Sequence, residues 1–224
     1  EEARRRGKKA TMKLLGYWRS SATYRVRIAL ALKGLDYDYQ PVNLLKGEQS
    51  GAEYTKKNPQ ALVPTLVTDA GEEISQSLAI IEFLQETFPS PSVLPKTPIL
   101  RAKARAIAAA IACEAQPFAN LRIQKYLTET LGVSDEAKAA FLNRWPGGAL
   151  NAVETMARET TGAFCVGDEP TIADAFLVPQ IFASRRFNID LSNCPTLLAI
   201  DERCQKLPAF IKAHPDNQPD AVKG

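Results

Sequence analysis

The stretch GYWRSSATYRVRIAL, residues 16–30, passes from a strand-like start through a cluster of hydroxyl side chains into a helix. Ser20 and Ser21 stand where the strand is expected to give way to the helix. Unpaired N–H groups and the positive end of the helix dipole favour an anion at such a point. A hydroxyl there can donate a hydrogen bond to a thiolate and lower the pKa of the thiol from its usual value of about 8.5. The alternative is that one serine simply caps the helix.

The composition is that of an ordinary globular protein with one or two domains. The chain has 224 residues, of which 45% are hydrophobic and 24% are charged. Its formal net charge is +3, and the basic side chains of residues 1–11 account for this surplus. The remainder of the chain is therefore close to neutral, which argues against a nucleic-acid-binding body.

Residues 1–11 form a basic leader without the apolar run of a secretory signal, and we predict that it is disordered. A cloning remnant or a basic address are the alternatives. No stretch approaches the roughly 18 apolar residues of a membrane span. The four cysteines are widely spaced and the single histidine, His214, lies in a polar stretch, so neither a metal site nor a histidine-based triad is predicted. Free thiols fit a reducing compartment, and we expect the protein to be cytoplasmic.

The first part of the chain alternates short apolar runs with helical patterns. A βαβ unit, a connecting segment and a ββα unit are predicted, which together form an α/β domain over residues 12–89. Gly34 is expected to end the first helix. The runs are KLLGYW (13–18), TYRVRIALALKG (23–34), YDYQPVNL (37–44), VPTLVTDAGEEI (63–74) and SLAIIEFLQETF (77–88).

A proline-rich segment separates this part from an all-helical one. FPSPSVLPKTP contains four prolines, which predicts a linker over residues 90–99. The chain from 100 to 224 is predicted to be an α-helical bundle, because it is rich in alanine and in helix-start signals. One helix is expected to open with a capping box formed by Thr171 and Asp174, in a purely structural role.

Several motifs occur in the order and spacing of one known family. The βαβ–ββα domain followed by helices resembles the cytosolic glutathione transferases, and the first motif is similar to the serine-rich signature of the zeta class, the maleylacetoacetate isomerases. The resemblance covers roughly residues 12–218. It implies a thioredoxin-like glutathione-binding domain, a helical substrate domain and a homodimer. The motifs are RSSATYRVRIAL, NPQALVPTL, QSLAIIEFL, QPFANLR and VGDEPTIADAFLVPQIFASRRFNIDL.

The resemblance implies that Ser20 or Ser21 activates the sulfur of glutathione. We favour Ser20 for the close contact, although spacing does not separate the two. The family signature usually carries a cysteine where this chain has Ala22, which excludes a mechanism that needs that thiol but leaves activation by serine intact.

Two further segments are implied to hold glutathione. Proline permits a cis bond after Val63, and a turn there could expose the Val63 backbone for strand-like pairing with a peptide. In the family the residue at Val63, before Pro64, pairs with the cysteinyl backbone. Gln76 and Ser77 match the pair that binds the γ-glutamyl end; Ser77 is also expected to cap the next helix, whose N-terminus suits a carboxylate. Weaker matches to glutathione-contacting positions are Gln49, Gln116 and Asn120.

Arginines are the candidates for gripping an acidic substrate. Arg19 and Arg186 are predicted to pair with its carboxylates, the alternative for both being a solvent-facing salt bridge. Arg25 and Arg27 lie two positions apart on a helix and point in different directions. Arg25 is a candidate for the glutathione site, whereas Arg27 is expected to be structural.

The resemblance implies conversion of maleylacetoacetate to fumarylacetoacetate in tyrosine and phenylalanine breakdown. A maleylpyruvate isomerase and a transferase that conjugates haloacids and other electrophiles are the rival enzymes. A non-catalytic module of the same fold is a fourth possibility. The intact Ser20, Ser21, Val63-Pro64 and Gln76-Ser77 argue against that module.

Overall fold

The computed structural model describes residues 12–222, which fall into two compact units. One unit comprises the described residues up to Pro91 together with those from Ile211 onward, and the other runs from Ser92 to Phe210. The predicted basic leader lies outside the described residues. Within residues 12–222, no helix combines the length and the apolar character that a bilayer crossing demands.

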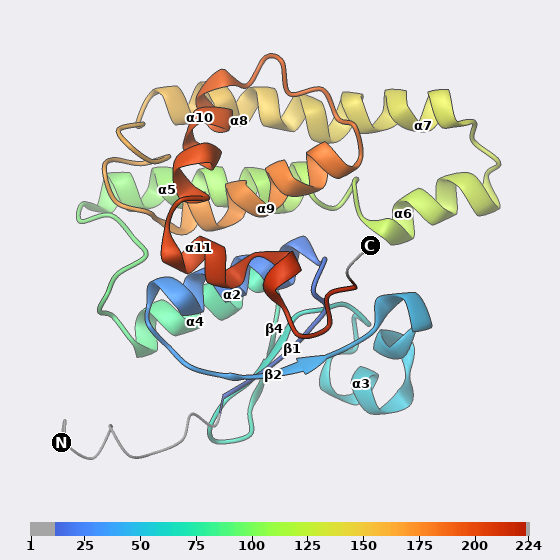
Figure 1. The fold of residues 1–224 in the computed structure, drawn as a ribbon, viewed down its shortest axis with the longest axis horizontal. Helices are drawn as coiled ribbons and strands as arrows, with labels where there is room; N and C mark the ends of the chain where they lie inside the picture. The colour runs from blue at the N-terminus through green and yellow to red at the C-terminus, as the bar shows by residue number, and fades with distance from the viewer. Residues whose placement is uncertain (1–11, 223–224) are drawn as a thin grey trace. The chain divides into compact units, whose positions relative to one another are not determined.

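The first unit is built around a four-stranded mixed sheet. Its elements are β1 (Lys13–Gly16), α2 (Ser21–Leu32), β2 (Asp38–Pro41), α3 (Ala52–Lys57), β3 (Thr65–Val67), β4 (Glu73–Ser75) and α4 (Ser77–Thr87) (Figure 1). The strand order is β2-β1-β3-β4, with β1 parallel to β2 and antiparallel to β3, and β3 antiparallel to β4. Helices α2 and α4 pack against each other and bury Val26 and Ile80 completely. The predicted βαβ–ββα order is confirmed.

The change from β1 to α2 comes earlier than predicted. β1 ends at Gly16 because the chain turns there, with the N–H of Ser20 donating to the carbonyl of Tyr17 at 3.0 Å. A Cβ at Gly16 would clash with the side chain of Thr23, so the glycine allows the helix start to approach the strand. Gly34 follows the helix with a φ of 63°, and this left-handed residue ends it as predicted.

The connecting segment contains structure that the sequence patterns did not predict. Besides α3 it forms two 3₁₀ turns, η1 (Leu44–Lys46) and η2 (Glu48–Ser50). The side chain of Asn43 accepts the N–H groups of Leu45 and Lys46, which stabilises the first turn. These short turns place Gln49 on the same unit as the hydroxyl pair.

The second unit is helical in the residues described. It contains α5 (Pro98–Ala110), η3 (Ile111–Ala115), α6 (Leu121–Lys125), η4 (Tyr126–Thr130), α7 (Asp135–Leu142), η5 (Asn143–Gly147), α8 (Gly148–Arg158), α9 (Ile172–Arg186) and α10 (Pro195–Cys204). The largely buried α9 packs against α5 and α10. Its predicted capping box is confirmed: Thr171 and Asp174 exchange hydrogen bonds, and Asp174 also accepts the N–H of Cys165 at 2.8 Å. The box therefore ties α9 to the preceding loop.

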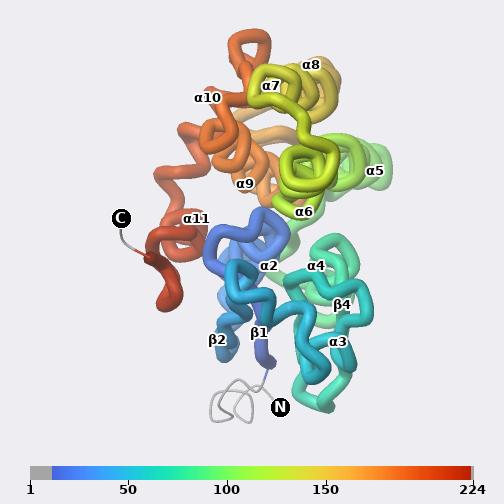
Figure 2. Tube along the Cα trace, turned by 90° about the vertical axis from the view of Figure 1, so that its right-hand side faces the viewer, coloured from blue at the N-terminus to red at the C-terminus, as the bar shows by residue number. Residues whose placement is uncertain are grey.

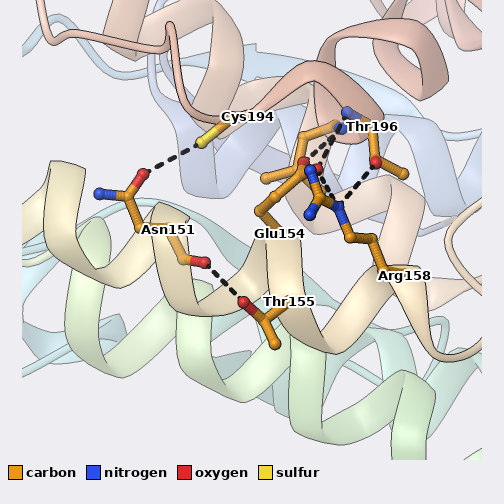
Figure 3. A network of polar contacts seen from close by, with 7 residues as sticks. Asn151, Glu154, Thr155, Arg158, Cys194 and Thr196 are labelled. Atoms are coloured by element: carbon orange, nitrogen blue, oxygen red, sulfur yellow. Dashed lines mark hydrogen bonds and ion pairs between the residues drawn. The ribbon is translucent and has the colours of Figure 1, made fainter.

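A buried carboxylate fixes the start of α10. Glu154 of α8 accepts the N–H groups of Thr196 and Leu197 at 3.2 and 3.0 Å, and Arg158 pairs with it from the next turn (Figure 3). Burial raises the pKa of Glu154, but these hydrogen bonds outweigh burial and hold it below its ordinary value. Glu154 therefore caps the N-terminus of α10, a role that the N-cap residue of the helix itself usually performs.

The C-terminal segment groups with the first unit, which differs from the predicted helical domain reaching residue 224. After α11 (Pro208–Ala213) the chain lies beside α2 (Figure 2). Arg27 of α2 donates to the carbonyl of Ala213 at 2.9 Å, and Asp220 accepts the N–H of Trp18 at 3.0 Å. A helical pattern alone gave no sign of this return. The remaining domain limits stay a prediction.

Candidate active site

The hydroxyl pair stands at the start of α2. Ser20 is the N-cap, and its side-chain oxygen accepts the N–H of Thr23 at 3.2 Å. Ser21 is the first helical residue, and both serines are half-buried. The capping role considered for one serine is thus real for Ser20. It occupies only a lone pair of the oxygen, so the hydroxyl hydrogen can still be donated.

The first turn of α2 suits a negatively charged sulfur. It contains no acidic side chain, so nothing in that turn neutralises the positive end of the helix dipole. A thiolate beside a hydroxyl donor in such surroundings is favoured over the thiol, which lowers the thiol pKa. The structure therefore offers the environment that thiol activation requires.

The loop before β3 presents a free backbone segment. Val63 precedes Pro64 through a cis peptide bond. The carbonyl of Leu62 is held by the hydroxyl of Tyr54 at 2.7 Å and by the side-chain amide of Asn58 at 2.6 Å. Within residues 12–222, no backbone hydrogen bond engages the N–H or the carbonyl of Val63. These groups can pair with an extended peptide, as the sequence predicted; the pairing itself stays a prediction.

The start of α4 corrects one sequence expectation. Ser77 is not the N-cap but the first helical residue, and Gln76 stands at the cap with a φ of 70°. The side-chain amide of Gln76 donates from Nε2 to the side-chain oxygen Oε1 of Gln60 at 2.8 Å, and no described side chain caps the helix. The first N–H groups of α4 are therefore open to a ligand carboxylate.

Arg25 connects the two helix starts. Ser21 and Arg25 are four residues apart on α2 and share one face. The guanidinium of Arg25, 2% exposed, donates from Nη1 to the hydroxyl of Ser77 at 3.3 Å. A buried cation thus lies next to the open start of α4, where it adds to the attraction for an anion. Arg27 points elsewhere, to the carbonyls of Trp18 and Ala213, which confirms its structural role.

Gln49 has an unsatisfied buried oxygen. Its side chain lies in η2, and Oε1 has no hydrogen-bond partner among the described residues. A buried amide oxygen without a donor is costly, and native structures usually provide one. A ligand N–H group could supply it, which is consistent with the predicted contact to glutathione.

The predicted substrate arginines belong to different units. Arg19 is exposed and its guanidinium lies over the ring of Trp18, 4.2 Å from the centroid. Arg186 ends α9 and lies over the ring of Phe187 at 4.3 Å. Its neighbour Arg185 is bound to the buried Asp201 at 2.7 Å. Arg185 is therefore tied to the helical core through Asp201, although both arginines are exposed.

The other two predicted contacts lie in the second unit. Gln116 follows the π-helical turn η3, and Asn120 is the N-cap of α6, where its oxygen accepts the N–H of Arg122. The amide hydrogens of Asn120 can still be donated. In the part of the chain that the structure describes, no cluster of His, Cys, Asp or Glu is arranged to hold a metal ion.

Four residues that support the site were not predicted from the sequence to belong to it. Tyr54 and Asn58 fix the loop before Val63, and Arg27 and Asp220 hold Trp18. Asn58 begins the motif NPQALVPTL, which is the one sequence signal that points to it. Nothing in the sequence could connect Asp220 with a residue 202 positions away.

The geometry fits a small peptide thiol. The start of α2 suits its sulfur, the backbone of Val63 suits its own backbone, and the start of α4 suits a carboxylate. All three belong to the first unit.

Comparison with known proteins decides the family. Residues 10–86 match the family described as "Glutathione S-transferase, N-terminal domain". The chain is 46% identical to a probable maleylacetoacetate isomerase of Vibrio cholerae over 93% of this chain and 97% of that protein. The chain belongs to the zeta-class glutathione transferase and maleylacetoacetate isomerase family.

Solved structures of the family agree with the fold. A holo structure of maleylpyruvate isomerase, described as a bacterial zeta-class glutathione transferase, superposes with a TM-score of 0.89 at 40% identity, covering 94% of this chain and 100% of that one. A maleylacetoacetate isomerase from Anaeromyxobacter dehalogenans with glutathione in its active site gives 0.85 at 41% identity, covering 95% and 98%. The predicted thioredoxin-like domain followed by helices is confirmed, and the zeta-class relatives are enzymes.

Proposed function

We propose that the protein is a glutathione-dependent isomerase that converts maleylacetoacetate to fumarylacetoacetate in tyrosine and phenylalanine breakdown. The observation that carries the proposal is the arrangement on α2: Ser20 and Ser21 begin an acid-free helix, and Arg25 links that helix to Ser77. The V. cholerae relative supports the choice of substrate by its name. We place the reaction in the cytoplasm, where glutathione is reduced, and expect a homodimer.

The first unit provides most of the contacts to glutathione. Ser20 or Ser21 donates a hydrogen bond to its sulfur, with Ser20 the first choice. The backbone of Val63 pairs with the cysteinyl residue. The open start of α4, with Ser77 and Arg25, binds the γ-glutamyl carboxylate. Gln49, Gln76, Gln116 and Asn120 provide further polar contacts.

The isomerisation requires a thiolate and cationic side chains that bind the acidic substrate. When bound, glutathione would supply a thiolate that adds to the cis double bond; after rotation about the resulting single bond, loss of the same thiolate would restore the double bond in the trans isomer and regenerate glutathione. Arg19 and Arg186 pair with the substrate carboxylates and orient them. A cation near the carbonyl oxygen also stabilises the negative charge that develops there.

Maleylpyruvate is the rival substrate. The maleylpyruvate isomerase structure resembles this chain as closely as the maleylacetoacetate isomerase structures do, and the chemistry is the same on a shorter acid. Conjugation of haloacids is a third possibility, because it needs the same activated thiol. A non-catalytic module would not need the open start of α4 or the free backbone of Val63.

The test is turnover of maleylacetoacetate and maleylpyruvate, each with and without glutathione, in the wild type, Ser20→Ala and Ser21→Ala. We expect fast glutathione-dependent isomerisation of maleylacetoacetate and a loss of about a hundredfold in the variant that lacks the activating hydroxyl. A preference for maleylpyruvate would replace the substrate and retain the mechanism. No turnover of either acid would overturn the isomerase proposal, leaving a conjugating transferase or a binding module.

Ser134→Ala is the matched control for Ser20→Ala. Ser134 caps α7 by accepting the N–H of Ala137 at 3.2 Å, the same bond that Ser20 makes. Both changes remove a cap worth about 1 kcal/mol. Only the change at Ser20 should lower turnover, which separates loss of a cap from loss of a thiol contact.

A further inference from the structure

Trp18, two residues before Ser20, is held by hydrogen bonds to both its backbone N–H and its backbone carbonyl. The N–H of Trp18 donates to Oδ2 of Asp220 at 3.0 Å, and its carbonyl accepts from Nη2 of Arg27 at 3.0 Å. Trp18 is 3% exposed and only Arg19 separates it from Ser20. The two hydrogen bonds therefore hold the two peptide units that flank Trp18, directly before the turn that carries both serines.

The C-terminal segment contributes to both of these hydrogen bonds. Asp220 belongs to it, and Arg27 is fixed by donating from Nε to the carbonyl of Ala213 at 2.9 Å. Oδ2 of Asp220 also accepts the hydroxyl of Tyr39 at 3.1 Å. Burial lowers the pKa of Arg27 and raises the pKa of Tyr39, so the tyrosine remains a protonated donor.

We propose that Asp220 is a positioning residue for thiol activation: through the N–H of Trp18 it sets the place of the Ser20 and Ser21 hydroxyls relative to the glutathione sulfur. The proposal rests on the proposed function. A hydroxyl donor must be held to within about 0.5 Å of its productive position, and displacements of an ångström cost large factors in rate. The half-buried carboxylate of Asp220, hydrogen-bonded to the backbone N–H of Trp18, provides such support.

The first experiment needs no glutathione. Amide hydrogen exchange at Trp18, Ser20 and Ser21 is compared by NMR in the wild type, Asp220→Ala and Asp220→Asn. We expect exchange at Trp18 to rise about tenfold in Asp220→Ala, because a hydrogen bond to a charged group is lost. The asparagine retains an acceptor and should show a smaller rise. Asp216→Asn, which removes an equal charge from an exposed position of the same segment, should leave exchange unchanged.

The second experiment measures the bound thiol. The pH dependence of thiolate absorbance gives the pKa of glutathione on each variant, and steady-state kinetics gives kcat and KM. We expect Asp220→Ala to raise the thiol pKa and to lower kcat about tenfold with little change in the KM for the acid. Asp220→Asn should recover part of both effects, which a general loss of stability would not do.

The outcomes separate the two proposals. Unchanged exchange at Trp18 in Asp220→Ala, or faster exchange with an unchanged thiol pKa, would overturn the positioning role while the isomerase proposal stood. A wild type that bound no glutathione would overturn both, whatever the exchange data showed about the fold. Melting curves of each variant confirm that the measurements are made on folded protein.

Discussion

At the scale of single residues, Ser77 has a role that sequence rules assign wrongly. It does not cap α4 but lies within hydrogen-bond distance of Arg25 at the open helix start. Ser77→Ala should therefore weaken glutathione binding about tenfold. It should also lower the free energy of unfolding by about 1–3 kcal/mol, because Nη1 of the buried Arg25 loses this acceptor. Titration calorimetry and urea unfolding measure the two quantities.

Ser134→Ala is the control for Ser77→Ala, because Ser134 caps a helix of the second unit. It should lower the free energy of unfolding by about 1 kcal/mol and leave glutathione affinity unchanged. If Ser77→Ala bound glutathione like the wild type, the assignment of the α4 start to the γ-glutamyl carboxylate would be wrong.

Residue identities predicted much of the candidate site, but not its supports. The hydroxyl pair was found because a capping residue and an anion-binding residue obey the same local rule at a helix start. The cap of α4 was missed because Gln76 adopts a positive φ, which glutamine rarely does. Asp220 was missed because its contact is long-range, and no local pattern encodes such a contact.

At the scale of elements, α10 depends on a carboxylate from another helix. Its own N-cap, Cys194, makes no side-chain capping bond, and Glu154 takes that place. Glu154→Gln keeps the shape and removes the charge, so it should lower the free energy of unfolding by about 1–2 kcal/mol at neutral pH. Urea unfolding across pH measures the loss.

The pH dependence of that loss has a definite sign. The folded state holds the pKa of Glu154 below its ordinary value of 4.5, so the stabilisation is complete above that pH and is lost as pH falls through the lowered pKa. The difference between wild type and Glu154→Gln should therefore shrink under acid conditions. Glu159→Gln is the control, because Glu159 pairs with Lys103 at an exposed site and should matter little. A difference independent of pH would exclude the carboxylate charge as the cause.

Elements with a strong period were predicted, and short irregular ones were not. The βαβ–ββα order and the capping box of α9 follow from apolar spacing and cap residues. The turns η1 and η2 contain three residues each, too few for a period to be visible. Strand β1 ended early because the packing of Thr23 on Gly16, not β propensity, determines where the chain turns.

At the scale of the whole molecule, the chain returns to its first unit after the helical one. The segment from Ile211 onward was assigned from sequence to the helical domain, because residues 100–224 were predicted to form one helical bundle. Contacts between distant segments decide its place, such as those of Arg27 with the carbonyl of Ala213 and of Asp220 with the N–H of Trp18, and no local pattern encodes them. Local patterns can thus predict the fold class without predicting the boundary between the two units.

Each unit contains one of the two tryptophans, Trp18 in the first and Trp145 in the second, so tryptophan fluorescence can report on each unit separately. In Trp145→Phe, which retains an aromatic ring beside Phe118, fluorescence reports Trp18 alone. Glutathione at about a hundred times its Kd should raise the free energy of unfolding seen by Trp18 by about 2.7 kcal/mol, since it binds only the folded state.

S-methylglutathione separates the parts of the ligand in the same measurement. It retains the γ-glutamyl carboxylate and the peptide backbone but has no ionisable thiol, so it should stabilise the protein through Val63 and α4 alone. Ser20→Ala should then reduce the stabilisation by glutathione and leave that by the methylated ligand unchanged. An equal reduction for both ligands would mean that Ser20 supports the fold of the site and makes no contact with the thiolate, and the activating role would pass to Ser21.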